Sequence, residues 1–424
     1  MENYKPRIAD QILKEKLSYK GAVLIEGPKW CGKTTTAEQA AKSILYMSDP
    51  RTLKQNLSLA ESDSSILLKG ENPRLIDEWQ VAPQLWDAVR FEVDHRHAFG
   101  QFILTGSSVP ADKDRILHSG TGRFSWLKMR TMSLLESGES NGQVSLKSLF
   151  SNPDKIYGES NISLESLAYL VCRGGWPIAT YLEGKSALNQ ARDYFDAVLY
   201  NDINRMGTGK RDPERLRRIM VSYARNQGTQ IGYKTIVDDI RANEEDNIDS
   251  RTVASYINAL KEMFVIEDMP AWNPNLRSKA AIRTTDTRYF IDSSIAAAAL
   301  GISPDDLIND LKTFGFLFKT MAIRDLRVYA ESIDGNVYHY RDKSDLECDA
   351  VIHLRDGSYG LVEIKLGGET AIESGAKSLT KLASIIDTDK MKKPSFMMIL
   401  TGIGNIAYKR SDGIYVVPIG SFGI

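Results

Sequence analysis

The stretch Gly27-Pro28-Lys29-Trp30-Cys31-Gly32-Lys33-Thr34, followed by Thr35, decides the fold of the first part of the chain. It reads G-x-x-x-x-G-K-[ST], the signature of a phosphate-binding P-loop. Residues 22–25 before it are continuously apolar, and residues 34–41 contain neither glycine nor proline. A buried strand, a loop and a helix are therefore predicted in this order. This order directs backbone N–H groups and the positive end of the helix dipole to one point, which suits nucleotide phosphates.

Two side chains of this stretch have the chemistry that ATP and Mg²⁺ require. Lys33 is expected to reach the β- and γ-phosphates, and Thr34 is expected to place its hydroxyl group on Mg²⁺. The backbone N–H groups of residues 27–35 are expected to surround the phosphates. The alternative is a chance match to the pattern in a chain of 424 residues.

Composition and charge set limits on the class of protein. The 424 residues exceed the size of one ordinary core and suggest about three domains. Lys and Arg number 54 against 55 Asp and Glu, so any anion site must be local. The three scattered cysteines, Cys31, Cys172 and Cys348, fit a reducing compartment. The N-terminus has no apolar core, and no apolar run reaches the roughly 18 residues of a membrane span, so we expect a cytoplasmic protein.

A second motif of the predicted nucleotide site is Leu75-Ile76-Asp77-Glu78, an apolar run that ends in two carboxylates. Asp77 is expected to hold Mg²⁺ through water, and Glu78 is expected to activate the attacking water. Adjacent side chains of a strand point to opposite faces, so both can act only where the strand ends. The alternative is a solvated acidic pair at the end of a strand.

A third buried strand is predicted within Gln101 to Ser108, and it ends in small hydroxyl residues. Thr105 and Ser107 are candidates to sense the γ-phosphate or orient the water, although turn residues would have the same composition. Arg123 follows, with Arg115 shortly before it. An arginine here could stabilise charge on the γ-phosphoryl group, within its own subunit or, in an oligomer, in a neighbour. The alternative is a surface arginine beside a glycine turn.

The chain resembles a prokaryotic family of AAA-type ATPases that carry a C-terminal domain of unknown function related to restriction-endonuclease folds. The matching segments cover nearly the whole chain: 27–34, 75–80, 104–108, 120–123, Gly174-Gly175-Trp176-Pro177 and Val362-Glu363-Ile364-Lys365. The resemblance implies an α/β fold, in which a P-loop ATPase core has a central parallel sheet. The alternation of predicted strands and helices indicates the same core.

The middle of the chain is predicted to be helical, with a winged helix-turn-helix pattern. A loop-like composition covers 137–161, and helices are expected at 163–170 and 187–203. Two short helices at 233–242 and from 250 onward, then strands at 265–271 and 288–291, form the winged pattern. Its outward residues would be Arg251, Ser255 and Asn258 on the second helix, with Arg277, Lys279 and Arg283 on the wing. Basic residues at 215, 217, 218 and 225 add to a candidate nucleic-acid surface, while 244–246 are acidic.

The last third is predicted to be an α/β domain with a restriction-endonuclease-like fold. Residues 348–354 and 359–366 flank Asp356-Gly357, which is a hairpin signal. Asp349 on one strand with Glu363 and Lys365 on the other is the pattern of a Mg²⁺-dependent nuclease. The alternative is ordinary alternation of charge on an exposed face. Lys319 occupies the position at which the resemblance implies a further acidic ligand, so we expect no nuclease activity.

These predictions give four domains and three functional hypotheses. The domains are a P-loop ATPase domain at 1–140, a helical linker or lid at 141–210, a winged-helix-like domain at 211–295 and a restriction-endonuclease-like domain at 296–424. The first hypothesis is a Mg²⁺-dependent ATPase that acts as a nucleotide-driven switch or motor with a C-terminal output module. The others are an ATP-regulated metal-dependent nuclease and a non-enzymatic, nucleotide-sensing DNA-binding regulator. Glu78 favours hydrolysis, because a sensor would not need it.

Overall fold

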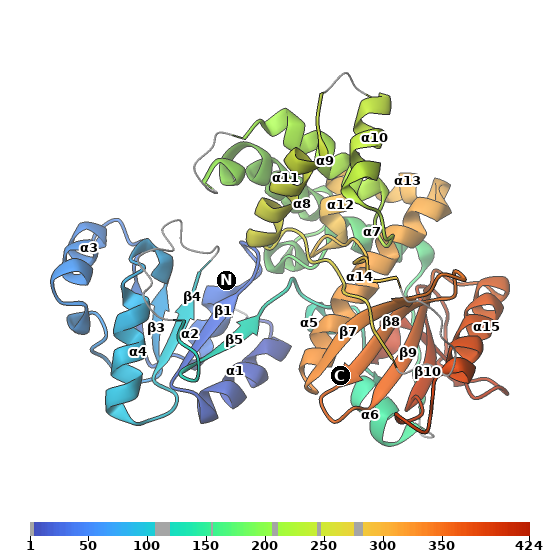
Figure 1. Cartoon of the computed structure of the whole chain (residues 1–424), viewed down its shortest axis with the longest axis horizontal. Helices are drawn as coiled ribbons and strands as arrows, with labels where there is room; N and C mark the ends of the chain where they lie inside the picture. The colour runs from blue at the N-terminus through green and yellow to red at the C-terminus, as the bar shows by residue number, and fades with distance from the viewer. Residues whose placement is uncertain (1–3, 107–118, 154–155, 206–210, 244–246, 275–282) are drawn as a thin grey trace. The chain divides into compact units, whose positions relative to one another are not determined.

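The computed structural model describes residues 4–106, 119–153, 156–205, 211–243, 247–274 and 283–424. The chain folds into two compact units (Figure 1). The first unit contains Met1–Thr131, Asn204–Gly209 and Ala259–Phe264. The second unit contains Met132–Ile203, Lys210–Asn258 and Val265–Ile424.

The first unit is built on a five-stranded parallel sheet with the strand order β2-β3-β4-β1-β5. Its strands are β1 (Ala22–Glu26), β2 (Ser43–Tyr46), β3 (Arg74–Asp77), β4 (Phe102–Thr105) and β5 (Phe124–Lys128). Its helices are α1 (Ile8–Tyr19), α2 (Lys33–Ala40), α3 (Leu53–Ser62) and α4 (Leu85–Arg96). The predicted parallel sheet is confirmed, because every strand pair in it runs parallel.

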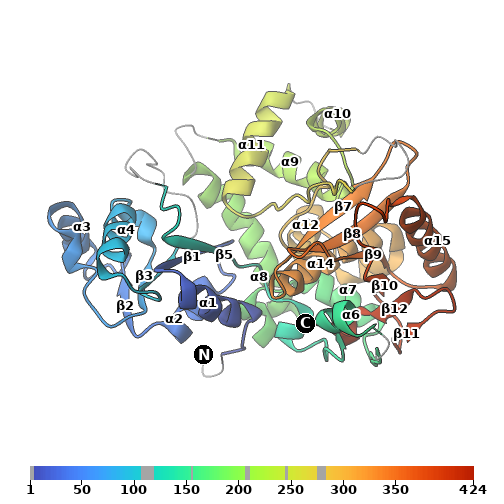
Figure 2. The ribbon, with the colours of Figure 1, turned by 60° about the horizontal axis from the view of Figure 1, so that its bottom comes forward.

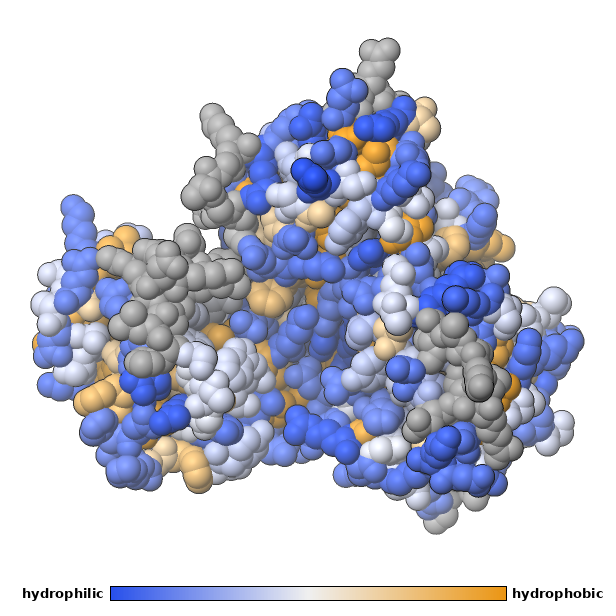
Figure 3. All heavy atoms as spheres, in the orientation of Figure 1, coloured by the Kyte–Doolittle hydropathy of each residue, from blue (hydrophilic) through white to orange (hydrophobic). Residues whose placement is uncertain are grey.

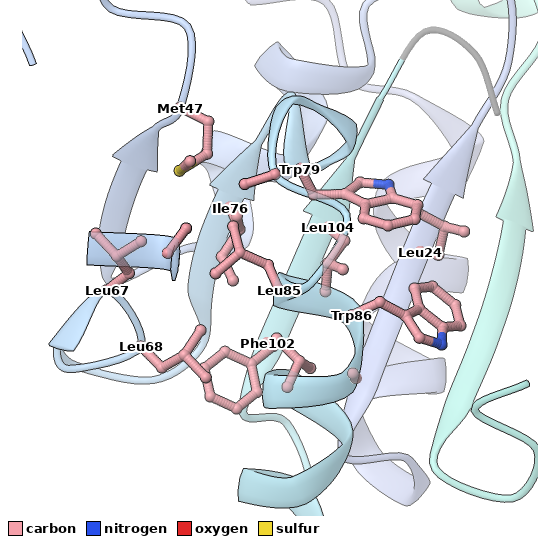
Figure 4. Packing of buried hydrophobic residues seen from close by; sticks show 14 of the residues in the cluster. Leu24, Met47, Leu67, Leu68, Ile76, Trp79, Leu85, Trp86, Phe102 and Leu104 are labelled. Carbon is pink, nitrogen blue, oxygen red and sulfur yellow. The ribbon is translucent and has the colours of Figure 1, made fainter. Parts of the chain in front are cut away.

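Both faces of this sheet are covered by helices, which explains its continuously apolar strands. Leu13 of α1 and Ala37 of α2 pack on the face that carries Val23 and Ile25 of β1. On the opposite face, Leu85 and Trp86 of α4 pack among apolar side chains of three strands, Leu24, Ile76 and Leu104 (Figure 4). Because β1, β3 and β4 pair parallel, their carboxyl ends lie at the same end of the sheet.

The second unit has a mixed six-stranded sheet with the order β11-β12-β10-β9-β8-β7 (Figure 2). Its strands are β7 (Gly335–Arg341), β8 (Glu347–Leu354), β9 (Tyr359–Lys365), β10 (Phe396–Thr401), β11 (Tyr408–Lys409) and β12 (Tyr415–Pro418). The predicted hairpin is present as β8 and β9, which pair antiparallel. A separate two-stranded sheet joins β6 (Val144–Ser145) to β13 (Phe422–Gly423) near the C-terminus.

Helices make up the rest of the second unit. They are α5 (Leu134–Ser137), α6 (Leu146–Ser151), α7 (Leu164–Arg173), α8 (Gly184–Ala197), α9 (Pro213–Arg225), α10 (Tyr233–Asn243), α12 (Ser293–Leu300), α13 (Pro304–Asn309), α14 (Leu311–Glu331) and α15 (Glu369–Ile385). Helix α11 (Ser250–Glu262) is divided between the units, because its residues up to Asn258 belong to the second unit and those from Ala259 belong to the first. The helix predicted at 187–203 ends at Ala197 as an α-helix, and a π-helical turn follows it. The stretch 137–161, predicted as loop, contains β6 and α6.

The two segments predicted as the strands of the wing, 265–271 and 288–291, run antiparallel to each other and are joined by backbone hydrogen bonds. Ile291 donates its N–H to the carbonyl oxygen of Val265 at 3.0 Å, and Met269 and Thr287 donate to each other at 2.8 and 2.9 Å. Pro270 has no N–H group for a further ladder bond, and Ala271 instead bridges to His339 of β7. The winged-helix assignment stays a prediction.

The Gly174–Pro177 motif is held by a network of buried charges in the second unit. Gly175 donates its N–H to Asp292 Oδ2 at 2.9 Å, and the indole N–H of Trp176 donates to Ser294 Oγ at 3.0 Å. Arg324 donates to Asp292 Oδ2 at 3.0 Å and to Asp325 Oδ1 at 2.8 Å. The motif is therefore a turn packed by an aromatic ring, with charged partners that the sequence does not indicate.

Hydrophilic side chains cover most of the face drawn in Figure 3. Among the helices of the described residues, none combines the length and the hydrophobicity needed to cross a bilayer.

Candidate nucleotide-binding site

The predicted P-loop lies between β1 and α2 and is shaped by two glycines with positive φ. Gly27 has a φ of 152°, and a Cβ atom there would lie 2.2 Å from the carbonyl oxygen of Met129. Gly32 has a φ of 98° and is the N-cap residue of α2, so this position offers no side chain to accept hydrogen bonds from the first turn of the helix. The first-turn N–H groups of α2 are therefore left for another acceptor. This geometry fits a phosphate group.

The Lys33 side chain folds back over the loop. Its ammonium group donates to the carbonyl oxygens of Gly27 at 2.8 Å and Pro28 at 2.7 Å. The side chain is buried, so the charge is held against the backbone of the loop and not in bulk water. A lysine in this place puts a positive charge beside the free N–H groups of α2.

The side chains of Asp77, Thr34 and Thr105 meet at the carboxyl ends of the parallel strands. The hydroxyl groups of Thr34 and Thr105 each donate to Oδ1 of Asp77 at 2.7 Å. Within the part of the chain that the structure describes, no donor reaches Oδ2 of Asp77. One carboxylate and one hydroxyl group fit Mg²⁺, which binds few protein ligands and completes its shell with water and phosphate oxygens. No cluster of three or more acidic, histidine or cysteine side chains forms a metal site among the described residues.

Glu78 follows the last residue of β3 and has a left-handed backbone with a φ of 55°. This conformation turns the chain sharply, so Asp77 and Glu78 are not held on opposite faces of a strand. Gln80 donates its amide N–H to the Glu78 carboxylate. Burial raises the pKa of Glu78 above its ordinary value, and the neighbouring charge of Asp77 raises it further. Such a shift brings a carboxylate closer to the basicity of a general base.

Arg123 lies at the amino ends of the strands, whereas the P-loop lies at their carboxyl ends. It immediately precedes β5, whose first residue, Phe124, pairs with Ala22 at the start of β1. The P-loop follows the end of β1, so the length of the strand separates Arg123 from Lys33. Arg123 donates to Asp94 Oδ1 at 2.7 Å in a half-exposed ion pair. The fold therefore does not bring Arg123 to the P-loop of its own subunit, and its action on the site of a neighbouring subunit stays a prediction. Ser107 and Arg115 lie outside the described residues.

Arg7 is a residue of this site that the sequence does not indicate. Its guanidinium group is buried and donates to the carbonyl oxygens of Cys31 at 2.8 Å and Arg130 at 2.9 Å. It thereby ties the P-loop to the segment that follows β5. A single arginine before an amphipathic helix forms no recognisable sequence motif, so the sequence could not reveal this contact.

The second candidate metal site, at Asp349 and Glu363, is buried and contains two lysines. Lys319 Nζ lies 2.5 Å from Asp349 Oδ1, and Lys365 Nζ lies 2.6 Å from Glu363 Oε2. Burial alone would raise the pKa of Asp349, but Lys319 and then Lys365 lower it. Burial, and next the charge of Asp349, raise the pKa of Glu363. The alternative of an exposed face with alternating charge is wrong, because both carboxylates are buried. An ammonium group lies where a metal ion would need to bind.

The second helix of the predicted winged pattern, α11, exposes the three polar residues that are expected to face outward. Arg251, Ser255 and Asn258 of α11 are exposed. Of the basic residues on α9, Arg217 and Arg225 are exposed, and each forms an ion pair, Arg217 with Glu214 and Arg225 with Asp239. Arg283 pairs with Asp345, while Arg277, Lys279 and 244–246 lie outside the described residues.

Family models match three segments of the chain. An AAA domain matches residues 19–137, and two domains of unknown function, DUF8612 and DUF4143, match residues 164–306 and 314–422. Among curated proteins, no match is found.

Solved structures similar to the chain include a Walker-type ATPase of Pyrococcus abyssi, with 14% identity and a TM-score of 0.41 over 69% of this chain and 94% of that chain. A RuvB variant of Thermotoga maritima has 17% identity and a TM-score of 0.27 over 62% and 87%. A signal transduction ATPase with a tetratricopeptide repeat sensor from Pyrococcus horikoshii has 14% identity and a TM-score of 0.25 over 78% and 50%. Residues 19–137 thus combine a match to an AAA domain with a P-loop motif and a parallel sheet.

Proposed function

We propose that the protein binds and hydrolyses ATP with Mg²⁺ at the P-loop, and that the second unit is the output module of this nucleotide-driven switch. The observation that carries the proposal is the shared hydrogen bonding of Asp77. Its Oδ1 accepts from both Thr34 and Thr105, so residues from α2, β3 and β4 converge on one carboxylate beside the loop. A chance match to the P-loop pattern would not be accompanied by this convergence.

Each residue of the site has a distinct task in this proposal. The free N–H groups at the start of α2 and the ammonium group of Lys33 bind the phosphates. Lys33 exchanges its bonds to the Gly27 and Pro28 carbonyls for bonds to phosphate oxygens. Thr34 and Asp77 hold Mg²⁺, which neutralises charge that develops on the phosphates.

Glu78 is the proposed general base for the attacking water. Its raised pKa and its position directly after Asp77 support this role. The amide of Gln80 orients its carboxylate. Thr105 acts as a positioning residue, because its bond to Asp77 limits the directions in which the carboxylate can turn.

The nuclease alternative is not supported by the second cluster. The ion pair between Lys319 and Asp349 places a positive charge against the carboxylate that would bind a metal ion, and the two cations would repel each other. Contact of nucleic acid with the exposed polar residues of α11 stays a hypothesis, and salt-sensitive binding to a DNA duplex is its test.

Release of phosphate from ATP tests the enzymatic proposal. Parent protein should release phosphate with Mg²⁺ and lose this activity when the metal is chelated. Lys33→Ala and Glu78→Gln should each lower kcat at least about a hundredfold. The controls are Lys54→Ala and Glu61→Gln, which change exposed residues of α3 and should keep parental activity. Phosphate release that survives Glu78→Gln would exclude Glu78 as the base, and release that survives both variants would overturn the proposed site.

A further inference from the structure

A cavity of ≈ 760 Å³ is formed entirely by residues of the second unit. One wall is a single face of α7, formed by residues that recur at helical spacing: Glu165, Tyr169 and Arg173. Glu139, which follows α5, and Asn161, which precedes α7, line other parts of it. Ligand cavities of soluble proteins have volumes of this order.

The cavity contains a buried arginine with unused donor capacity. The Arg173 side chain is 6% exposed, donates from Nε to the carbonyl oxygen of Gly174 at 3.0 Å and donates from Nη1 to Glu139. In the described parts of the chain, Nη2 has no acceptor. A buried guanidinium group is stabilised when each of its N–H groups finds an acceptor oxygen. The cavity therefore favours a ligand that brings a carbonyl or carboxylate oxygen to Nη2.

The charge of the cavity favours a ligand that is also positive. Glu139 and Glu165 contribute two carboxylates against the one guanidinium group of Arg173. Burial alone would raise the pKa of Glu139, but the hydrogen bond and charge of Arg173 lower it below its ordinary value, so it stays ionised. A free phosphate or nucleotide would meet repulsion from both carboxylates.

The other groups that line the cavity are of kinds that can bind the main chain of a peptide. The amide of Asn161 is exposed, and an amide side chain can both donate and accept, as a peptide group does. Ile162 and Leu170 add apolar surface on which the methylene groups of a long side chain can pack.

We propose that this cavity receives a segment of a partner polypeptide that carries an arginine or lysine side chain. A main-chain carbonyl oxygen of the segment accepts from Arg173 Nη2. The basic side chain lies on the apolar wall and reaches the carboxylates of Glu139 and Glu165. Because every lining residue belongs to the second unit, the proposal does not depend on the nucleotide site.

Ligand-observed saturation-transfer NMR with the full chain tests this proposal. The probes are N-acetyl-arginine N-methylamide, its lysine and glutamate counterparts, and agmatine, each at about 10 mM because single contacts of this kind bind weakly. The capped arginine and lysine should receive saturation from the protein, and the capped glutamate should not. Agmatine, which lacks the peptide groups, should bind at least about threefold more weakly than capped arginine.

Matched variants locate the binding. Glu165→Gln should weaken binding of the capped arginine about threefold, because it removes one carboxylate at an exposed position. Glu183→Gln, an exposed residue that precedes α8 and does not line the cavity, should leave binding unchanged. Lack of saturation on every probe would overturn the proposal, as would equal binding of the capped glutamate or an unaltered affinity in Glu165→Gln. Equal binding of agmatine would overturn the polypeptide as the ligand and replace it by a free amine or guanidine.

Discussion

Thr105 donates its hydroxyl hydrogen to Asp77 Oδ1 over 2.7 Å, from the last residue of β4 to the last residue of β3. The two strands are neighbours in the sheet, and Asp77 and Thr105 are paired in register. Both residues are buried. The contact orients the carboxylate that also accepts the hydroxyl group of Thr34.

Thr105→Val should remove the hydrogen bond that orients the Asp77 carboxylate, while it preserves the shape of the side chain at position 105. We expect kcat for ATP hydrolysis to fall about tenfold and the stability to fall by about 1 kcal/mol, because one buried hydrogen bond is lost. The affinity for ATP should change less than about twofold, since Lys33 and the loop backbone are intact. Steady-state kinetics and calorimetric binding separate the two effects. Thr370→Val, which changes an exposed threonine of α15, is the control. An unaltered kcat in Thr105→Val would show that Asp77 needs no support from β4.

Gly27→Ala should destabilise the first unit and weaken nucleotide binding. The added methyl group would lie 2.2 Å from the Met129 carbonyl oxygen, and the φ of 152° is unfavourable for alanine. We expect a loss of about 2 to 4 kcal/mol in the free energy of unfolding. Gly122→Ala is the matched control, because Gly122 also has a positive φ, 86°, but an added methyl group there would meet no atom within 4 Å. Equal losses in the two variants, measured by urea denaturation, would show that backbone strain and not the Met129 contact determines the cost.

Arg324→Met should be strongly destabilising. The Arg324 side chain is 1% exposed and lies between the buried carboxylates of Asp292 and Asp325. Removal of its charge leaves two carboxylates without their cation, which costs about 3 to 5 kcal/mol. Arg355→Met removes a surface ion pair with Asp334 and should cost less than about 1 kcal/mol. A cost for Arg324→Met no greater than that of Arg355→Met would contradict the assignment of this network as the support of the Gly174–Pro177 turn.

His339 should make the second unit less stable in mild acid. Burial lowers the pKa of His339 from 6.5 to about 4. Its Nδ1 lies 2.9 Å from the amide nitrogen of Gln230, and its Nε2 lies 3.1 Å from the carbonyl oxygen of Thr285, so the neutral ring with a proton on Nε2 fits both contacts. The unfolded chain binds the proton more readily than the folded one between pH 6.5 and 4. The stabilisation is therefore complete above pH 6.5 and is lost as the pH falls toward 4.

The full effect of His339 is about 3 kcal/mol. Free energies of unfolding measured from pH 7 to pH 4 should fall less steeply in His339→Gln than in the parent protein. His97→Gln changes an exposed histidine after α4 and should keep the parental slope. Parallel slopes for the parent protein and His339→Gln would contradict a buried, neutral His339.

The sequence predicts the P-loop and its flanking elements because their signals are local. An apolar run, two glycines and an unbroken helical stretch specify β1, the loop and α2 without information from elsewhere. The strand order is not local, and it is the order β3-β4-β1 that brings Asp77 and Thr105 to the loop. The roles of Thr34, Asp77 and Glu78 could be proposed from the sequence motifs. The sequence does not show that Thr34 and Thr105 donate to the same oxygen atom of Asp77.

The features of the structure that the sequence did not predict were also missed for physical reasons. The sequence suggests that Arg123 follows a strand, whereas it precedes β5, an edge strand whose sequence Phe-Ser-Trp-Leu-Lys mixes apolar and polar residues and gives a weak strand signal. The ion pair of Lys319 with Asp349 joins a helix to a strand 30 residues later, a distance over which periodicity carries no information. The two carboxylates at 349 and 363 look like solvated charges in the sequence because burial depends on helices packed over the sheet.

Calorimetric titration of the full chain with ATP and with ADP, in the presence of Mg²⁺, tests the central claim most directly. The account predicts saturable binding of both nucleotides to the parent protein, at least about tenfold weaker binding to Lys33→Ala, and parental binding to Lys54→Ala. Circular dichroism and thermal unfolding should first show that all three proteins are folded. The absence of binding heat for either nucleotide at millimolar concentration in folded parent protein would contradict a triphosphate site at residues 27–34.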